Sequence, residues 1–390
     1  MKVLQINSVC GKGSTGKIAS DLLSVLKNNG YEGIIAYGRD RANNCAESFK
    51  IGNDLDVKLH AALSRLTDKS GFYSKHFTKL LINKIKQYNP NIIHLHNIHG
   101  YYVNFKLLVN FLIEYNKPVV WTLHDCWIFT GHCAYYTYLN CDKFINGCSD
   151  CPNLNSYPKS YFDNSKNNYN IKKNLLLKLN NVVYVTPSLW LKNEVSKSFL
   201  GEKKCLVINN GIDDKVFSKK KSNFRKKYNL DNKKILLGVA NVWEKRKGLS
   251  DFIKISKLLN DNEVIVLVGK GLEKIEHNNI ITISRTSSQE ELAEIYSEAD
   301  YFLNPTYEDN YPTTNLESLA CGTPVITYNT GGSPEPVLEG CGSVVDVGDY
   351  IEMYNRTKLK YDAYKIKDIS KNLSKDVCFN KYIELYNSLL

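Results

Sequence analysis

The sequence lacks any long apolar segment. Its 390 residues are 43% hydrophobic and 23% charged, yet the longest apolar runs are short ones such as YFLNP and VIVLVG. These fall far short of the ~20 consecutive apolar residues that cross a bilayer. The opening MKVLQINSVCG also carries too few apolar residues for a secretory signal peptide. We therefore expect a cytoplasmic protein whose eleven cysteines mostly stay reduced.

The chain also lacks a concentrated basic stripe, although its formal net charge is +11. The lysines are scattered, and the densest group is KKKSNFRKK at residues 219–227. A scattered positive charge is typical of a solvated surface and argues against a nucleic-acid-binding module. It leaves open a peripheral contact with the anionic inner face of the cell membrane.

Short β-rich apolar runs alternate with helical patterns along the whole chain. Examples are KVLQIN, NIIHLHN and PVVWTLHD in the first half, and KILLGVAN and EVIVLVGKG in the second. This alternation predicts an α/β fold with two doubly wound parallel-sheet domains. We place the first domain at residues 1–200, with a cysteine-rich insert at 126–165, the second at 201–372, and at 373–390 a C-terminal helix that returns to the first domain. Ligands of such sheets bind at the carboxyl ends of the strands, so we expect the site in a cleft between the domains.

Capping signals mark the ends of two predicted helices. IASDLLSVLKNNG repeats apolar residues at Ile18, Leu22 and Leu26, which predicts a helix that ends at Gly30. SQEELAEIYSEAD predicts another helix with Ser288 as its N-cap.

The stretch SVCGKGSTGKIAS follows the first apolar run and places Gly11, Gly16 and Lys17 at the spacing of a P-loop. Residue 18 is Ile, where a P-loop needs a hydroxyl to hold Mg²⁺. Two interpretations remain: a tight turn that only packs, or an anion site made by the free N–H groups that open a helix. We favour phosphate binding over ATP hydrolysis, through the backbone of Gly13, Ser14, Thr15 and Gly16.

The second half contains PTYEDNYPTTNLESLACGTPVITYNTGGSPE at residues 305–335. Together with VINNGID (207–213), RKG (246–248) and EADYFLNPT, this block resembles glycosyltransferase family 4, and the resemblance covers essentially the whole chain. That family comprises retaining sugar-nucleotide transferases, so the resemblance implies the GT-B fold, with two Rossmann-like domains facing across a cleft. TLHDCWIFTGHC is similar to a branch found in bacterial polysaccharide clusters.

The resemblance assigns roles to two acidic residues. Glu317 would bind the ribose hydroxyls of the donor nucleotide, and Asp309 a hydroxyl of the transferred sugar. The family usually has Glu in the place of Asp309, and the adjacent Glu308 is an alternative for that role. For Glu317 the alternative is a capping box with Thr314. The backbone amides of residues 310–314 would hold sugar hydroxyls and the distal phosphate, as a helix N-terminus does for anions.

The resemblance also assigns a cation and a histidine. Lys247 matches the diphosphate-binding lysine, whose charge would offset the charge that grows on the leaving diphosphate. Asn241 stands where the family usually has Arg, and Arg246 is an alternative cation. His124 matches a histidine near the transferred sugar; the alternative is a structural histidine held by Asp125.

A larger set of residues is expected to hold the donor, with Arg285 near the nucleotide base. The donor-binding residues are Gly13, Ser14, Thr15, Gly16, Asn241, Arg246, Lys247, Arg285, Asp309, Asn310, Tyr311, Thr313, Thr314, Asn315 and Glu317. The resemblance implies four catalytic residues, which are His124, Lys247, Asp309 and Glu317.

The resemblance implies attack by the acceptor on the face from which the nucleoside diphosphate leaves. The donor would be a UDP- or GDP-sugar, with no cofactor needed for catalysis, and the acceptor a lipid-linked oligosaccharide or glycan. One alternative is a sugar-nucleotide phosphorylase or epimerase on the same fold. A second is a P-loop-like nucleotide-binding protein, against which the missing hydroxyl argues.

Three histidines cluster in HLHNIHG at His94, His96 and His99. Alternation along a strand is expected to separate their faces, so we interpret them as lining of the cleft and not as metal ligands.

The insert contains four cysteines within nineteen residues, which are Cys133, Cys141, Cys148 and Cys151. They predict either a structural zinc site or a set of buried thiols. The tyrosines of the same insert are candidates for stacking on sugar rings, namely Tyr135, Tyr136 and Tyr138.

Overall fold

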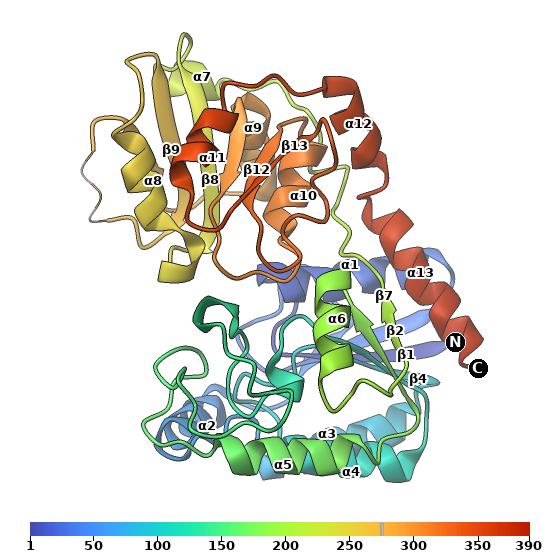
Figure 1. Cartoon of the computed structure of the whole chain (residues 1–390). Helices are drawn as coiled ribbons and strands as arrows, with labels where there is room; N and C mark the ends of the chain where they lie inside the picture. Colours follow the sequence, from blue (N-terminus) through green and yellow to red (C-terminus); the bar gives the residue numbers. More distant parts are fainter. Residues whose placement is uncertain (274, 276) are drawn as a thin grey trace. The chain divides into compact units, whose positions relative to one another are not determined.

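The computed structural model describes all residues except 274 and 276 (Figure 1). The chain forms two compact units, Met1–Asn209 with Phe379–Leu390, and Asn210–Cys378. Each unit is built on a single parallel β-sheet with helices packed against it. This confirms the predicted α/β class with two parallel-sheet domains. No helix in the described part of the chain has the length and hydropathy needed to span a bilayer.

The first unit has a seven-stranded sheet in the order β3-β2-β1-β4-β5-β6-β7. Its strands are β1 (Lys2–Asn7), β2 (Glu32–Tyr37), β3 (Ser48–Lys50), β4 (Ile92–Leu95), β5 (Val119–Thr122), β6 (Val182–Thr186) and β7 (Cys205–Val207). Its helices are α1 (Gly13–Asn28), α2 (Asp54–Thr67), α3 (Lys75–Tyr88), α4 (Phe105–Tyr115), α5 (Ser165–Leu176) and α6 (Leu189–Lys197), with short 3₁₀ turns η1 (Trp127–Phe129) and η2 (Thr137–Leu139). The strand order reverses between β1 and β4, and such a switch point is where open α/β sheets bind ligands.

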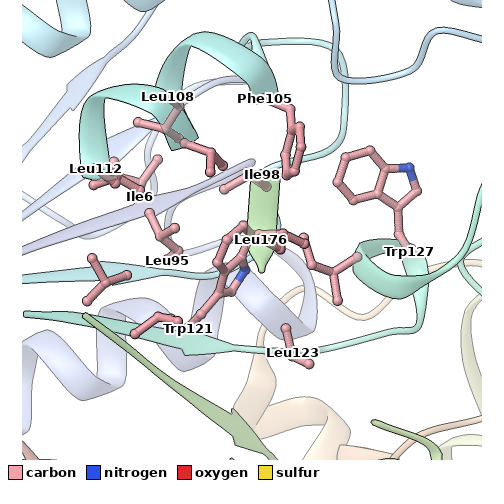
Figure 2. Packing of buried hydrophobic residues seen from close by; sticks show 14 of the residues in the cluster. Ile6, Leu95, Ile98, Phe105, Leu108, Leu112, Trp121, Leu123, Trp127 and Leu176 are labelled. Atoms are coloured by element: carbon pink, nitrogen blue, oxygen red, sulfur yellow. The ribbon is translucent and has the colours of Figure 1, made fainter. Parts of the chain in front are cut away.

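The core of this unit is formed by a row of register partners. Ile6, Leu95 and Trp121 lie side by side on β1, β4 and β5, and they pack with Leu108 and Leu112 of α4 (Figure 2). Each of these five side chains is at most 1% exposed. Burying a large apolar side chain contributes roughly 1.5–3 kcal/mol to the stability of the fold. This row therefore stabilises the positions of the carboxyl ends of β1 and β4.

Capping residues define several helix ends as predicted. Helix α1 ends at Asn28, and Gly30 follows it in the left-handed conformation, with φ of 75°. The side chain of Ser288 accepts from the amide of Glu291 at 3.2 Å and caps α9 (Gln289–Glu298).

The second unit has a six-stranded parallel sheet in the order β10-β9-β8-β11-β12-β13. Its strands are β8 (Lys234–Val242), β9 (Glu263–Lys270), β10 (Ile280–Ile283), β11 (Tyr301–Asn304), β12 (Val325–Tyr328) and β13 (Gly342–Val345). Its other elements are α7 (Phe224–Lys227), η3 (Lys245–Lys247), α8 (Leu249–Ser256), α9, α10 (Thr313–Ala320), α11 (Tyr350–Arg356) and α12 (Ala363–Lys371). The switch point here lies between β8 and β11.

The last helix, α13 (Lys375–Ser388), begins in the second unit and continues into the first. Tyr382 and Tyr386 are buried, and their hydroxyls bond to Thr122 Oγ1 at 2.8 Å and to His94 Nδ1 at 2.5 Å. Residues from Phe379 onward are therefore held on the first sheet by buried polar contacts.

Candidate active site

A lysine–aspartate pair lies at the switch point of the second sheet. Lys247 ends η3 after β8, and Asp309 lies in the loop after β11. The Lys247 Nζ and Asp309 Oδ2 atoms are 2.5 Å apart, and the two side chains are 21% and 14% exposed. The other oxygen of Asp309 accepts from the amide of Asn310 at 2.9 Å. The structure thus brings together two residues predicted for the donor site, and each neutralises the charge of the other.

The turn that contains Lys247 is fixed against the loop after β11. The carbonyl of Arg246 accepts from the amide of Tyr307 at 2.7 Å, and the Arg246 guanidinium donates to the carbonyl of Glu308 at 3.1 Å. Gly248 has φ of 72°, and a Cβ there would lie 2.1 Å from the carbonyl oxygen of Pro305. Only glycine fits this close approach, so the position of Lys247 is set by backbone contacts.

Three other residues of this unit were predicted to hold the donor, namely Arg246, Asn241 and Arg285. The Arg246 side chain also pairs with Glu244 at 3.1 Å, so its charge is already engaged. Asn241 is exposed at a register irregularity of β8, and Arg285 is exposed after the edge strand β10. Within the described residues no hydrogen bond or ion pair connects Asn241 or Arg285 to the Lys247–Asp309 pair.

The N-terminus of α10 has open backbone amides. Its N-cap is Pro312, which supplies no side-chain acceptor, so the first-turn amides at Thr313 and Thr314 have no cap. Asn310 and Tyr311, just before the helix, are buried. Asn315 is fully buried, donating to the carbonyl of Ser333 at 2.9 Å and accepting from Asn304 at 2.8 Å. Asn315 therefore supports this helix end from beneath.

Glu317 lies one turn into α10 and is partly buried. Its carboxylate accepts from the hydroxyl of Tyr296 at 3.2 Å and from the hydroxyl of Thr313. Burial raises the pKa of Glu317 to about 7, although both hydrogen bonds act in the opposite direction. The capping-box alternative is wrong, because the helix begins at Thr313 and places Thr314 inside the first turn.

The glycine loop lies at the switch point of the first sheet, between β1 and α1. The amide of Gly11 donates to the carbonyl of Gly16 at 3.0 Å, which closes the turn. The N-cap residue Lys12 offers no side-chain acceptor to the amides of Gly13 to Gly16. Lys17 pairs with Asp21 at 3.0 Å along the helix, and Ile18 is buried. Buried Ile18 offers no hydroxyl for Mg²⁺, so the loop lacks the metal-binding part of a P-loop.

Three histidines line a small pocket in the same unit. The pocket is lined by His96, His99, His124 and Asp125, among others. His96 Nδ1 lies 3.0 Å from His124 Nε2, and His99 Nε2 lies 2.8 Å from Asp125 Oδ2. Burial lowers the pKa of His124 to about 4, so this imidazole is neutral at neutral pH.

Two expectations about these histidines are wrong. Asp125 accepts from His99 and from the amide of Trp127 at 2.9 Å, so it does not hold His124. The rings of His94 and His96 are stacked with centroids 4.2 Å apart, so strand alternation does not separate their faces. Residues two apart on a strand share a face, and β4 ends at Leu95, directly before His96.

The cysteine-rich insert does not support the zinc expectation. No group of three or more His, Cys, Asp or Glu side chains in the described chain could hold a metal ion. The hydrogen bond between the thiols of Cys133 and Cys151 lowers the pKa of Cys151 to about 7. The Cys148 sulfur accepts from the amide of Gly131 at 3.2 Å. The alternative of thiols packed in the insert fits these contacts better.

Tyr136 of the insert and Lys172 of α5, which lies beyond the insert, are structural. Tyr136 is buried and donates to Glu194 at 2.6 Å, so it is not available for stacking on a sugar, whereas Tyr138 is 52% exposed. Lys172 is 1% exposed and donates to the carbonyls of Trp127 at 2.7 Å and Thr130 at 3.1 Å. Burial lowers the pKa of Lys172 to about 7. Nothing in the local sequence around Lys172 indicated this role.

Comparisons with known proteins cover both units. A family model described as Glycosyltransferase Family 4 matches residues 16–216, and one described as Glycosyl transferases group 1 matches residues 220–359. The chain is 24% identical over 372 residues to the Escherichia coli (strain K12) protein WcaC, which is named as a colanic acid biosynthesis glycosyl transferase, with 92% of this chain and 90% of that protein covered. It is 29% identical over 208 residues to the Escherichia coli O-antigen biosynthesis glycosyltransferase WclY, with 49% of this chain and 58% of that protein covered.

Solved structures share the fold. Sucrose-phosphate synthase from Thermosynechococcus elongatus superposes with a TM-score of 0.72 at 14% identity, over 100% of this chain and 99% of that one. HepE from Anabaena, in complex with UDP-glucose, superposes with a TM-score of 0.68 at 15% identity over 100% of both chains. These likenesses identify the GT-B type of architecture, and the first family model spans more than half of the sequence. The chain therefore belongs to glycosyltransferase family 4.

Proposed function

We propose that this protein is a retaining glycosyltransferase that uses a nucleoside-diphosphate sugar to build a cell-surface polysaccharide. The observation that carries the proposal is the Lys247–Asp309 pair beside the open amides of α10, at the switch point of the second sheet. A cation next to a helix N-terminus suits a diphosphate. The names of WcaC and WclY support the biosynthetic setting.

In the proposed complex the donor replaces contacts that the residues of the site make with one another. The diphosphate takes Lys247 from Asp309 and accepts hydrogen bonds from the first-turn amides of α10. Asp309 is then free to accept from a hydroxyl of the sugar. Glu317 binds the ribose hydroxyls, and a hydroxyl pair is a suitable partner for a carboxyl group that is close to half protonated at neutral pH.

The chemistry proposed is substitution at the anomeric carbon with retention. The acceptor oxygen bonds to that carbon while its bond to the diphosphate breaks on the same face, and the acceptor proton passes to a departing phosphate oxygen. Lys247 and the helix amides stabilise the growing charge on the leaving group. The protein contributes by positioning the reactants and by electrostatics, since no side chain serves as nucleophile in this scheme.

The acceptor proposed is a lipid-linked oligosaccharide or glycan. A relative from Campylobacter jejuni, 25% identical over 48% of this chain and 54% of its own length, is named as an N-acetylgalactosaminyltransferase acting on a diphospho-undecaprenol acceptor. The net charge of +11 supports a peripheral contact with an anionic membrane, where each surface Lys or Arg contributes about 1 kcal/mol.

The experiment is a donor screen on the full-length chain. Melting temperature and turnover are measured with UDP-, GDP- and ADP-sugars, with Lys247→Ala and Glu317→Ala as variants. Lys245→Ala is the matched control, since Lys245 lies in the same turn and is exposed. A donor at 100 times its Kd stabilises the fold by ~2.7 kcal/mol, and we expect that shift with one nucleotide class, retained in Lys245→Ala and lost in the other two.

The reaction products distinguish a retaining glycosyltransferase from a phosphorylase or an epimerase. Proton NMR of the product should show an anomeric configuration equal to that of the donor. Release of a sugar phosphate, or an isomerised sugar nucleotide, would instead identify a phosphorylase or an epimerase. A melting shift with Mg²⁺-ATP alone would point to the glycine loop as a nucleotide site and refute the proposal.

A further inference from the structure

A continuous chain of hydrogen bonds connects α1 to His124 inside the first unit. The Gln5 Nε2 atom donates to the carbonyl of Ala19 at 3.1 Å. The Gln5 Oε1 atom lies 2.9 Å from His96 Nε2, and His96 Nδ1 lies 3.0 Å from His124 Nε2. Gln5, His96 and His124 are 0%, 2% and 8% exposed, so water does not compete for these bonds.

The proton positions along this chain follow from its first member. A carbonyl oxygen only accepts, so the amide nitrogen of Gln5 must face Ala19 and its oxygen must face His96. The His96 Nε2 atom therefore carries a proton that it donates to Gln5. In a neutral imidazole the other nitrogen is an acceptor, so His96 Nδ1 accepts from a proton on His124 Nε2.

Both rings are neutral over the physiological range. Burial lowers the pKa of His96 well below its usual value, and it lowers the pKa of His124 to about 4. Within the described part of the chain, His124 Nδ1 has no hydrogen-bond partner, although the residue lines the pocket. The neutral His124 thus has its unprotonated Nδ1 lone pair uncommitted.

We propose that Gln5 and His96 are positioning residues that fix His124 in the Nε2–H tautomer, so that His124 Nδ1 accepts a hydrogen bond from a sugar hydroxyl. The opposite tautomer would present an N–H group, which can bond only to the oxygen of the same hydroxyl and would leave the hydroxyl proton without its acceptor. The choice of a sugar as the ligand rests on the proposed function. The tautomer itself does not.

A second chain of hydrogen bonds runs beside the one from Gln5 but does not reach His124. His94 stacks on His96, but its nitrogens bond to Thr122 Oγ1 at 2.8 Å and to Tyr386 Oη at 2.5 Å. Two parallel polar chains thus run through the same region, and only the one from Gln5 ends at His124. Thr122→Val, which removes a hydroxyl from the second chain, is therefore a matched control for Gln5→Met, which removes the polar end of the first at nearly equal volume.

The first experiment measures the tautomer directly on full-length protein without donor. In ¹⁵N-histidine-labelled protein, two-bond ¹H–¹⁵N spectra distinguish protonated from unprotonated ring nitrogens, with signals assigned through His96→Asn and His124→Asn. We expect Nε2–H for both His96 and His124 in the wild type and in Thr122→Val. In Gln5→Met the signals of His124 should move toward a mixture of tautomers. A wild-type His124 with its proton on Nδ1, or one unaffected by Gln5→Met, would overturn the inference.

The second experiment tests the functional atom with the donor identified by the screen. His124→Asn keeps an oxygen near the place of Nδ1, whereas His124→Gln keeps an amide near the place of Nε2. Loss of one neutral hydrogen bond corresponds to a fall of about 2- to 12-fold in kcat/KM. We expect a fall of this size in Gln5→Met and His124→Gln, and a smaller one in His124→Asn and Thr122→Val. A greater loss in His124→Asn than in His124→Gln would refute the role of Nδ1, and a correct tautomer without any sugar-nucleotide turnover would refute the proposed function alone.

Discussion

Glu317→Gln should stabilise the unliganded protein while it weakens donor binding. The carboxyl pKa is raised from 4.5 to about 7 in the folded state. Between these values the folded state binds more protons than the unfolded state, so the stability contributed by this group falls as pH rises from 4.5 to 7 and then stays constant. At 1.36 kcal/mol per pH unit, the full difference of 2.5 units corresponds to ~3.4 kcal/mol as an upper bound.

Gln removes this cost because it is neutral at every pH and can still accept from Tyr296 and contact Thr313. In the absence of donor, Glu317→Gln should melt at a temperature close to that of the wild type at pH 4.5. Above pH 7 it should be more stable, and 1 kcal/mol corresponds to about 2–4 °C for a unit of this size. Differential scanning fluorimetry between pH 4.5 and 8.5 measures both limits.

The two outcomes separate burial from function. Equal melting temperatures at all pH values would show that Glu317 is not destabilised by burial. A variant less stable than the wild type above pH 7 would show that the carboxylate makes net favourable contacts, which contradicts a destabilising burial of Glu317. The donor-induced shift, measured on the same samples, should shrink in Glu317→Gln if the carboxylate binds the ribose hydroxyls.

Three further substitutions test separate parts of the structure. Asp309→Asn removes the partner charge of Lys247, so the free nucleoside diphosphate should bind more tightly while turnover falls, as isothermal titration and a transfer assay would show; unchanged diphosphate affinity would contradict this. Gly248→Ala should lower the melting temperature, since the left-handed backbone alone costs about 1–2 kcal/mol and the new Cβ overlaps a carbonyl oxygen; a stable variant with normal donor binding would disprove the tight fit. Tyr386→Phe leaves His94 Nδ1 buried without its partner, which should cost ~1–3 kcal/mol in unfolding free energy by denaturant titration; no change would mean that α13 is held by apolar packing alone.

The fold was predictable because its signals are local and repeated. Apolar strands such as KVLQIN and EVIVLVGKG alternate with amphipathic helices, and only parallel sheets covered by helices bury that pattern. The end of α1 before Gly30 and the cap at Ser288 depend on a few adjacent residues, so they too were predicted correctly. Carboxyl ends of strands meet at one edge, which explains why Lys247 and Asp309 come together although 62 residues separate them.

The wrong predictions concern residues whose partners are determined by tertiary contacts. Asp125 is adjacent to His124 in sequence but bonds to His99, because the loop after β4 places that ring beside it. The four insert cysteines have a spacing compatible with zinc, but spacing does not ensure that four sulfurs converge on one point. The donor-binding roles of the individual residues remain predictions.

Only one weak feature of the sequence indicated the hydrogen-bond chain through Gln5. Gln5 interrupts an otherwise apolar strand, and a polar residue at a buried strand position requires a partner. The partner, His96, is 91 residues away, and Tyr386 lies 292 residues from His94. Such pairings follow from strand order and from the return of α13, so they become visible only once the fold is known.

In the proposed donor site, the Lys247–Asp309 pair would favour a complete sugar nucleotide over a free diphosphate. Lys247 is neutralised by Asp309, and burial keeps Glu317 close to half protonated near neutral pH, so the site holds little uncompensated charge. A free diphosphate that takes Lys247 leaves Asp309, only 14% exposed, without its cation, and an unpaired buried charge is costly. A sugar nucleotide brings a hydroxyl that can donate to the released carboxylate and offset that cost. The lysine–aspartate pair would thus couple diphosphate binding to the presence of the sugar, and it would also favour release of the diphosphate once the sugar has been transferred.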